Sequence, residues 1–190
     1  SKVAPHMVIG GPSQSGRSSV LQAIGLSIAY SYSPEEAGIV LVDGTQTSLR
    51  RLRKLPHVID WVTEEEALDF HLRSLIEELK IRRKIKNSLG DDETGTSPMR
   101  LTRRLFFIID DYDLTREVIP VSEKLLGTLA RHIRKDFDLN FHFIISSNSQ
   151  SLGRDTDPLI KQIKLLRCGI SLINPDTMEN LGNRVTSSMR

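Results

Sequence analysis

The chain has 190 residues, 38% of them hydrophobic, which is enough for one α/β domain with a buried core. Its 26 basic and 24 acidic residues nearly balance and so provide little overall attraction to DNA or to an anionic membrane. A single cysteine, Cys168, excludes an internal disulfide, fits a reducing compartment, and has the apolar neighbours of a small core residue. Neither a bilayer-spanning segment nor a signal peptide is recognisable, so we expect a soluble domain.

The first predicted unit is a strand, a glycine-bounded loop and a helix. Met7-Val8-Ile9 is an apolar run typical of a short buried strand, and a helical pattern follows Gly16. Between them lies Gly11-Pro12-Ser13-Gln14-Ser15-Gly16-Arg17-Ser18-Ser19, which has the spacing of a phosphate-binding loop, G-x-x-x-x-G-K-[ST]. Its amides would form a nest for phosphate oxygens at the helix N-terminus. Ser18 stands where a hydroxyl binds Mg²⁺, and the simpler alternative is a turn that caps a helix.

One position of this loop departs from the motif. Arg17 replaces the lysine that delivers a compact charge to the β- and γ-phosphates. Arginine is larger, and its planar fork needs a different approach to a phosphate. We therefore expect nucleotide to bind mainly through the backbone amides, and phosphoryl transfer to be inefficient.

The next elements continue an α/β pattern. A capped turn is predicted at Ser33-Pro34-Glu35-Glu36, and Ile39-Val40-Leu41-Val42 has the unbroken apolar character of a strand buried on both faces. A capping box at Thr63 predicts a helix with leucines and isoleucines at helical spacing, and its basic end at 80–86 complements the helix dipole. We interpret this and the chain's two other short basic clusters as solvated faces. Residues 87–100 are polar, and we expect a mobile surface loop within one domain that spans residues 1–190.

The second motif is a strand that ends in two carboxylates. Leu105-Phe106-Phe107-Ile108-Ile109 predicts a central strand, followed by Asp110 and Asp111 in the form of a Walker B motif. Asp110 would hold the Mg²⁺ shell, and Asp111 would take the place of the base that orients water. Active motors usually carry glutamate there. Because a misplacement of about 1 Å can cost about a hundredfold in rate, Asp111 also predicts weak hydrolysis.

The last third of the chain predicts a helix, a strand, an amphipathic segment and a final strand. The helix carries apolar residues at 125, 126, 129 and 133, and the strand over 141–145 ends in Ser146-Ser147-Asn148. Asn148 at this strand tip is a candidate γ-phosphate sensor, and His142 within the strand is expected to be a packed residue. The amphipathic segment lies near 159–166 and the final strand at 169–173.

With both motifs present, the chain resembles ATPase domains of the FtsK/SpoIIIE family over about residues 4 to 185. The resemblance rests on the segment Pro5-His6-Met7-Val8-Ile9-Gly10-Gly11, on Leu55-Pro56-His57-Val58, and on the strand from Phe141 to Asn148. Three departures stand out: Arg17 for lysine, Asp43-Gly44-Thr45 for an Asp-Pro-Lys turn, and 147–149 for Thr-Gln-Arg. With the segment 110–114, they resemble the degenerate C-terminal ATPase domains of EccC/EssC proteins, above all the last of three in a row.

This resemblance implies a three-layer, RecA-like P-loop NTPase fold with a mainly parallel sheet flanked by helices, and it implies ATP and Mg²⁺ as ligands. EccC/EssC proteins are membrane-anchored motors of type VII secretion. The resemblance therefore implies a cytoplasmic fragment of a longer chain, with neighbouring ATPase domains as partners and membrane contact only through other parts. It also implies recognition of secreted WXG-type helical hairpins through a C-terminal signal. DNA is not an expected partner.

Three functions remain open on the sequence. The favoured one is a degenerate ATPase module that binds nucleotide, hydrolyses it weakly or not at all, and recognises substrate or regulates a neighbouring motor domain. The second is an active DNA or protein translocase that needs an arginine finger, for which Arg131, Arg134, Arg154 and Arg184 are unranked candidates. The third is an interaction domain that has lost nucleotide.

Overall fold

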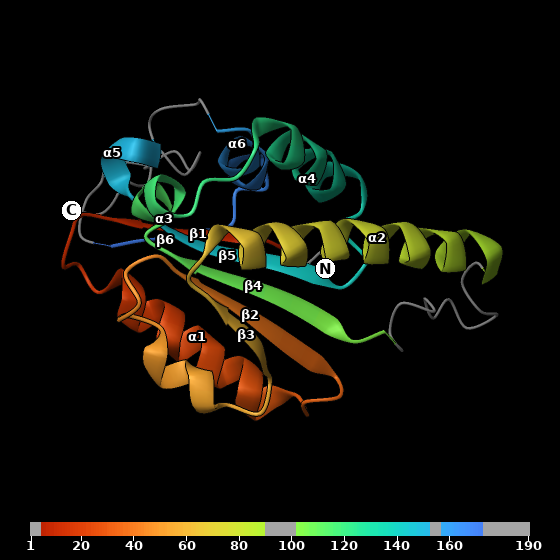
Figure 1. Cartoon of the computed structure of the whole chain (residues 1–190), viewed down its shortest axis with the longest axis horizontal. Helices are drawn as coiled ribbons and strands as arrows, with labels where there is room; N and C mark the ends of the chain where they lie inside the picture. Colours follow the sequence, from red (N-terminus) through yellow and green to blue (C-terminus); the bar gives the residue numbers. More distant parts are fainter. Residues whose placement is uncertain (1–4, 90–101, 153–156, 173–190) are drawn as a thin grey trace, which may run out of the picture.

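A computed structural model of the chain describes residues 5–89, 102–152 and 157–172 (Figure 1). Within them lies one six-stranded parallel sheet with the order β3-β2-β4-β5-β1-β6. The strands are Met7–Gly11 (β1), Ala37–Asp43 (β2), Val58–Val62 (β3), Arg104–Asp110 (β4), Phe141–Asn148 (β5) and Gly169–Ser171 (β6). The helices are Arg17–Ser31 (α1), Glu65–Leu89 (α2), Tyr112–Val118 (α3), Glu123–Lys135 (α4), Ser149–Leu152 (α5) and Pro158–Leu165 (α6), with a 3₁₀ turn at Arg50–Lys54 (η1).

Helices cover both faces of the sheet. Figure 1 shows α1 and η1 on one side and α2, α4 and α6 on the other, with the sheet between them. This arrangement confirms the predicted three-layer α/β fold. It also explains why the strands are apolar runs rather than alternating sequences, because a parallel sheet covered on both faces offers no position to water. All seven residues of β2 are buried.

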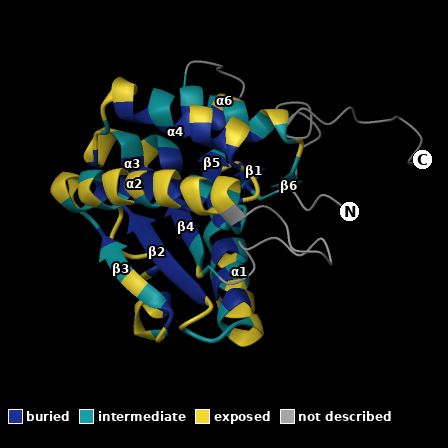
Figure 2. Ribbon diagram, turned by 90° about the vertical axis from the view of Figure 1, so that its right-hand side faces the viewer, coloured by how far each residue is buried: buried dark blue, intermediate teal, exposed yellow. Residues whose placement is uncertain are grey.

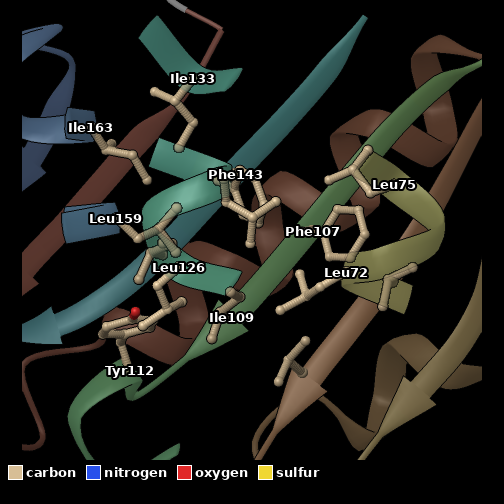
Figure 3. Close-up of a cluster of buried hydrophobic side chains, with 14 of the residues drawn as sticks. Leu72, Leu75, Phe107, Ile109, Tyr112, Leu126, Ile133, Phe143, Leu159 and Ile163 are labelled. Carbon is tan, nitrogen blue, oxygen red and sulfur yellow. The ribbon is translucent and has the colours of Figure 1, made fainter. Parts of the chain in front are cut away.

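The central strands of the sheet divide their side chains between two cores. Phe107 and Ile109 of β4 point into the larger core, beneath α2, α4 and α6 (Figure 3), while Phe106 and Ile108 point into the smaller core beneath α1 and η1. This alternation follows from the two-residue period of a strand. Figure 2 shows the result, with β2, β4 and β5 buried and the outer face of α2 exposed. Leu21 of α1 is fully enclosed in the smaller core.

The structure corrects several expected boundaries. The helix α2 begins at Glu65, two residues after Thr63, and runs to Leu89, so residues 87–89 of the predicted loop are helical; the rest of that loop lies outside the described residues. The sequence did not predict α3, which follows β4 directly. Cys168 is only partly buried, because it precedes the short outer strand β6, and the core position expected for it is wrong.

The basic end of α2 is not simply a solvated face, because one of its arginines is buried. Arg82 is 3% exposed, and its guanidinium donates to the backbone carbonyls of Leu139, Asn140 and Arg103 at 2.8 to 3.1 Å. These carbonyls precede β5 and β4, so a single side chain ties the helix to the beginnings of two strands. Its Nε also donates to Glu78 at 2.7 Å.

We predict that Arg82→Met destabilises the domain by about 3 kcal/mol, because the substitution leaves several partly or fully buried carbonyl oxygens without a donor. Urea denaturation followed by circular dichroism measures the change. Lys80→Met is the matched control, since Lys80 is exposed and its one ion pair within the described residues is with Glu77 on the same helix; it should cost less than about 0.5 kcal/mol. Equal losses in the two variants would contradict the role given to Arg82.

Two histidines pack at the start of β1 and β5. His142 stacks on Phe106 with ring centroids 4.6 Å apart and donates from Nδ1 to the carbonyl of Pro5 at 2.8 Å, which confirms it as a packed residue. His6 is 1% exposed, and its Nδ1 accepts the amide of Phe143 at 3.0 Å. Burial, with a smaller contribution from His142, lowers the pKa of His6 to about 3.

This low pKa predicts a loss of stability in mild acid. Between pH 6.5 and pH 3 the unfolded chain binds a proton at His6 that the folded chain does not, so the free energy of unfolding falls with pH by up to about 1.4 kcal/mol per unit. We predict that His6→Asn, which keeps an acceptor for Phe143, makes this slope shallower between pH 6 and pH 5. Denaturant titrations at each pH test it, and identical slopes in the two proteins would exclude His6 as the source.

Candidate functional site

The candidate site lies where β1, β4 and β5 end. Parallel strands bring their carboxyl ends to one edge of the sheet, and ligands of α/β folds bind there. The register pairs Gly11 at the end of β1 with Asn148 at the end of β5, while Ile109 of β4 pairs with Ile145 of β5. Because β5 lies between the other two strands, the glycine-bounded loop and Asp110 are separated by one strand tip.

Asp110 connects the two motifs across that strand tip. The Ser18 hydroxyl donates to its Oδ2 at 2.6 Å, over a sequence separation of 92 residues, and the Ser146 hydroxyl donates to its Oδ1 at 2.5 Å. The Ser146 oxygen also accepts the amide of Asp111 at 2.9 Å. The predicted meeting of Ser18 and Asp110 is therefore confirmed. The sequence did not identify Ser146 as their bridge, although its position in the polar tip of β5 was a signal.

The loop itself needs its glycines. Gly16 has φ of 95°, a left-handed conformation that strains other residues, and it forms the N-cap of α1. At Gly11 a Cβ would lie 2.4 Å from the Ser15 Oγ and 3.1 Å from the Leu172 Cβ, so a side chain there would force both neighbours to move. Gln14 also has a positive φ of 62°. The turn from Pro12 to Gly16 is thus held in a conformation that few sequences adopt.

The loop and the helix after it offer donors to an anion. The N-cap Gly16 makes no side-chain capping bond, and the first turn of α1 contains no acidic residue, so its positive end is not neutralised from within the helix. Two buried polar atoms, the Ser15 Oγ and the Arg17 Nη1, have no hydrogen-bond partner in the part of the chain that the structure describes. Buried polar groups are normally paired. These groups therefore fit a phosphate-bearing ligand, with Ser18 and Asp110 positioned to hold its Mg²⁺.

Arg17 and Asp111, the two departures from the motifs, face each other. The Arg17 Nη2 lies 3.5 Å from the Asp111 Oδ2, with the arginine side chain 9% exposed and the aspartate side chain 31% exposed. Asp111 has φ of 40° and forms the N-cap of α3. Burial raises the pKa of Asp111 above its usual value; Arg17 opposes this change, and the neighbouring carboxylates Asp110, Asp113 and Glu117 add to it.

Asn148, the candidate sensor, lies beside the loop, but its groups have protein partners. Its side-chain oxygen accepts the amide of Gln150 at 3.1 Å, and its own amide donates to Asp113 at 3.0 Å. Asp113 also accepts the Ser147 hydroxyl at 2.8 Å. Asp113 was not identified from the sequence, because its contacts depend on α3, a helix that the sequence did not predict. The sensor role of Asn148 stays a prediction.

Asp43 at the end of β2 is a third residue to which the sequence gave no role in the site. It is fully buried, pairs in register with Asp110, and accepts hydrogen bonds from the Thr45 hydroxyl, the Ser48 hydroxyl and the Leu49 amide. Its carboxylate therefore holds the turn after β2 in place.

The arginine-finger candidates lie apart from these contacts. Arg131 and Arg134 are exposed on α4, where Arg131 donates to Thr128 of the same helix. Arg154 and Arg184 lie outside the described residues. No finger is therefore assigned, and this part of the sequence interpretation stays a prediction.

Comparison with known proteins agrees with the geometry of the two motifs. The sequence model of the FtsK/SpoIIIE family matches residues 1–148, which include both motifs and the strand β5. The chain belongs to the FtsK/SpoIIIE family. Membership of this family of P-loop ATPases implies a nucleotide and its Mg²⁺ as ligands, which is consistent with the donors in the loop.

Relatives of this FtsK/SpoIIIE domain include secretion and DNA-translocating proteins. It is 25% identical over 161 residues to the ESX secretion system protein EccC of Thermomonospora curvata, covering 84% of this chain and 12% of EccC. The type VII secretion system protein EssC of Staphylococcus aureus is also 25% identical, over 79% of this chain and 10% of EssC. The DNA translocase SftA of Bacillus subtilis is 31% identical over 80% of this chain and 17% of SftA. The chain spans less than a fifth of each.

Solved structures confirm the fold of this FtsK/SpoIIIE domain. ATPases 2 and 3 of Thermomonospora curvata EccC, in complex with a signal sequence peptide, superpose with a TM-score of 0.70 at 23% identity, over 88% of this chain and 30% of that one. The pCW3 conjugation coupling protein TcpA, solved with ATPγS, gives 0.62 at 17% identity, over 85% of this chain and 47% of TcpA. Among the described helices, none is both long and apolar enough to cross a membrane.

Proposed function

We propose that this chain is a degenerate ATP-binding domain of a type VII secretion motor of the EccC/EssC kind, which binds Mg-ATP and hydrolyses it weakly or not at all. The observation that carries the proposal is the ion pair between Arg17 and Asp111. Both residues replace the ones on which phosphoryl transfer in this fold depends, and each is turned toward the other. Bound nucleotide would then help the domain to recognise a secretion substrate or to regulate a neighbouring motor domain, and would not drive mechanical work.

The binding half of the proposal rests on the loop and on the carboxylate behind it. The loop Gly11–Ser19 would surround the phosphates with amides, while Ser18 and Asp110 would hold Mg²⁺, which neutralises phosphate charge when bound. The Ser18–Asp110 hydrogen bond at 2.6 Å keeps these two groups together. Ser146 donates to the other oxygen of the Asp110 carboxylate, which supports a role for this carboxylate in holding the metal.

The weak hydrolysis rests on Asp111. Its amide is held by Ser146, which fixes the backbone from which the short side chain extends. Aspartate is one methylene shorter than glutamate, and an error of about 1 Å in the position of a base can cost about a hundredfold in rate. Its carboxylate also lies 3.5 Å from the Arg17 guanidinium, a contact that competes with an attacking water for the same oxygen.

The setting of the domain follows from its relatives. EccC and EssC are far longer than this chain, and solved EccC and EssC structures contain several ATPases, so we place this domain beside other ATPase domains of one protein. That protein would be membrane-anchored through its other parts, with this domain in the cytoplasm. An EccC structure holds a signal sequence peptide, which supports secreted WXG-type substrates as partners here. We propose that residues 1–190 are a single domain of such a multidomain chain, in the position of its last ATPase.

A second candidate function is an active FtsK/SpoIIIE-type translocase that acts on DNA or protein. The observation in its favour is the 31% identity to the DNA translocase SftA. It would require an arginine from a neighbouring domain and a catalytic role for Asp111. Against DNA stands the near balance of basic and acidic residues, because DNA binding draws on an excess of positive charge.

The first test measures nucleotide binding. Isothermal titration of the purified domain with Mg-ATP should show binding that Ser18→Ala weakens about tenfold or more, since it removes the hydroxyl assigned to Mg²⁺. Ser27→Ala, which changes an exposed serine further along α1 and outside the loop, should bind as the parent does. Absence of binding would instead favour an interaction domain that has lost nucleotide.

The second test measures hydrolysis. Steady-state phosphate release by the domain should be slower than that of an active FtsK motor domain assayed alongside by about a hundredfold, since both catalytic motifs are altered. The assay should be repeated with the neighbouring ATPase domains of the natural chain present, in order to supply any arginine finger. Turnover at the rate of the active motor, lost in Asp111→Ala, would establish the translocase alternative.

A further inference from the structure

We propose that the Arg17–Asp111 contact is an autoinhibitory ion pair, which must open before the phosphate loop can bind a nucleotide tightly. This inference rests on the proposed nucleotide site, and it names the contact that sets the affinity of that site for nucleotide. Arg17 belongs to the first motif of the site and Asp111 to the second, and in the structure their charged groups form an ion pair with each other.

The Arg17 guanidinium has a donor that no described residue accepts. Arg17 belongs to the first turn of α1, and its side chain is buried against the loop. A guanidinium carries five donors in a fork that matches phosphate oxygens. Here Nη2 lies 3.5 Å from Asp111, and Nη1 is buried without a partner in the described chain. An enclosed donor with no acceptor, at the edge of a phosphate-binding loop, is suited to a phosphate oxygen.

The aspartate half is held where it competes with such an oxygen. The Asp111 amide is fixed by Ser146, and its backbone has φ of 40°, an uncommon conformation for a residue with a side chain. The backbone that carries the carboxylate is therefore held beside Arg17. It neutralises the guanidinium that would otherwise attract a phosphate, and it adds negative charge beside the loop. Each phosphate that enters must displace this contact.

The thermodynamic consequence is a reduced apparent affinity. A protein whose binding-competent state is only partly populated binds its ligand more weakly by that fraction. Removing the carboxylate should therefore increase affinity for nucleotide, provided that Arg17 is present to use its freed donors. We expect a change on the scale of other coupled equilibria, about fivefold to 150-fold in affinity.

The experiment is a double-mutant cycle read by isothermal titration with Mg-ATP. Asp111→Asn should bind Mg-ATP on the order of tenfold more tightly than the parent. In the Arg17→Gln background the same Asp111→Asn change should give no gain. Glu117→Gln is the matched control, because Glu117 is an exposed carboxylate that interacts with Asp111 electrostatically and, among the described residues, forms no ion pair with Arg17. It should change affinity by less than twofold.

A second variant protects the test against misfolding. Asp111→Gly also removes the carboxylate and suits the positive φ at this position, so it should show the same gain. Circular dichroism confirms that each variant is folded. An equal gain in Glu117→Gln, or a gain that persists without Arg17, would overturn the ion pair as the cause. If neither the parent nor any folded variant binds Mg-ATP, the proposed nucleotide site itself fails, which is a different result.

Discussion

The contact on which the candidate site depends is the buried carboxylate of Asp110, shared between Ser18 and Ser146. The strand β5 separates the loop strand β1 from β4, so the two motifs cannot meet through the backbone. The carboxylate spans this gap with its two oxygens, one toward each serine. Because it is 4% exposed and accepts at both oxygens, a shift of the start of α1 or of the tip of β5 would leave an oxygen of a buried carboxylate without its donor. The geometry of the site is thereby coupled to the register of the sheet.

At the other end of the strands, where β4 and β5 begin, a different polar contact holds the sheet to a helix. Arg82 joins α2 to the segments that lead into β4 and β5, the same two strands whose far ends carry Asp110 and Ser146. Between these edges the strands are almost wholly apolar and buried by helices on both faces. The interior of such a domain is packed about as densely as an organic crystal. It is hard to compress, so a displacement at one point is transmitted to its neighbours. A rigid scaffold of this kind suits a site that requires three strand tips to stay aligned.

The site combines a well-formed cradle with altered catalytic positions. The backbone of the loop, its glycines and the Ser18–Asp110 contact keep what is needed to bind a nucleotide with Mg²⁺. The positions that govern phosphoryl transfer hold Arg17 and Asp111, which pair with each other. Binding and turnover are therefore separable in this fold, because backbone amides bind phosphate while individual side chains promote its transfer. A domain that keeps only the first ability is suited to sensing nucleotide or to recognising a partner.

Sequence alone determined the layers and the place of the site. Continuous apolar runs such as 39–42 and 105–109 are stable only when covered on both faces, and the motif spacing fixes which strand ends carry polar groups. Tertiary structure decided the rest. The helix α3 begins without a side-chain cap and gives no clear local signal, and the bridge through Ser146, the burial of Arg82 and the pairing of Arg17 with Asp111 each join residues far apart in the chain. Local patterns report which face is buried, but side-chain partners depend on which strands become neighbours and in what register, and only the assembled sheet sets that.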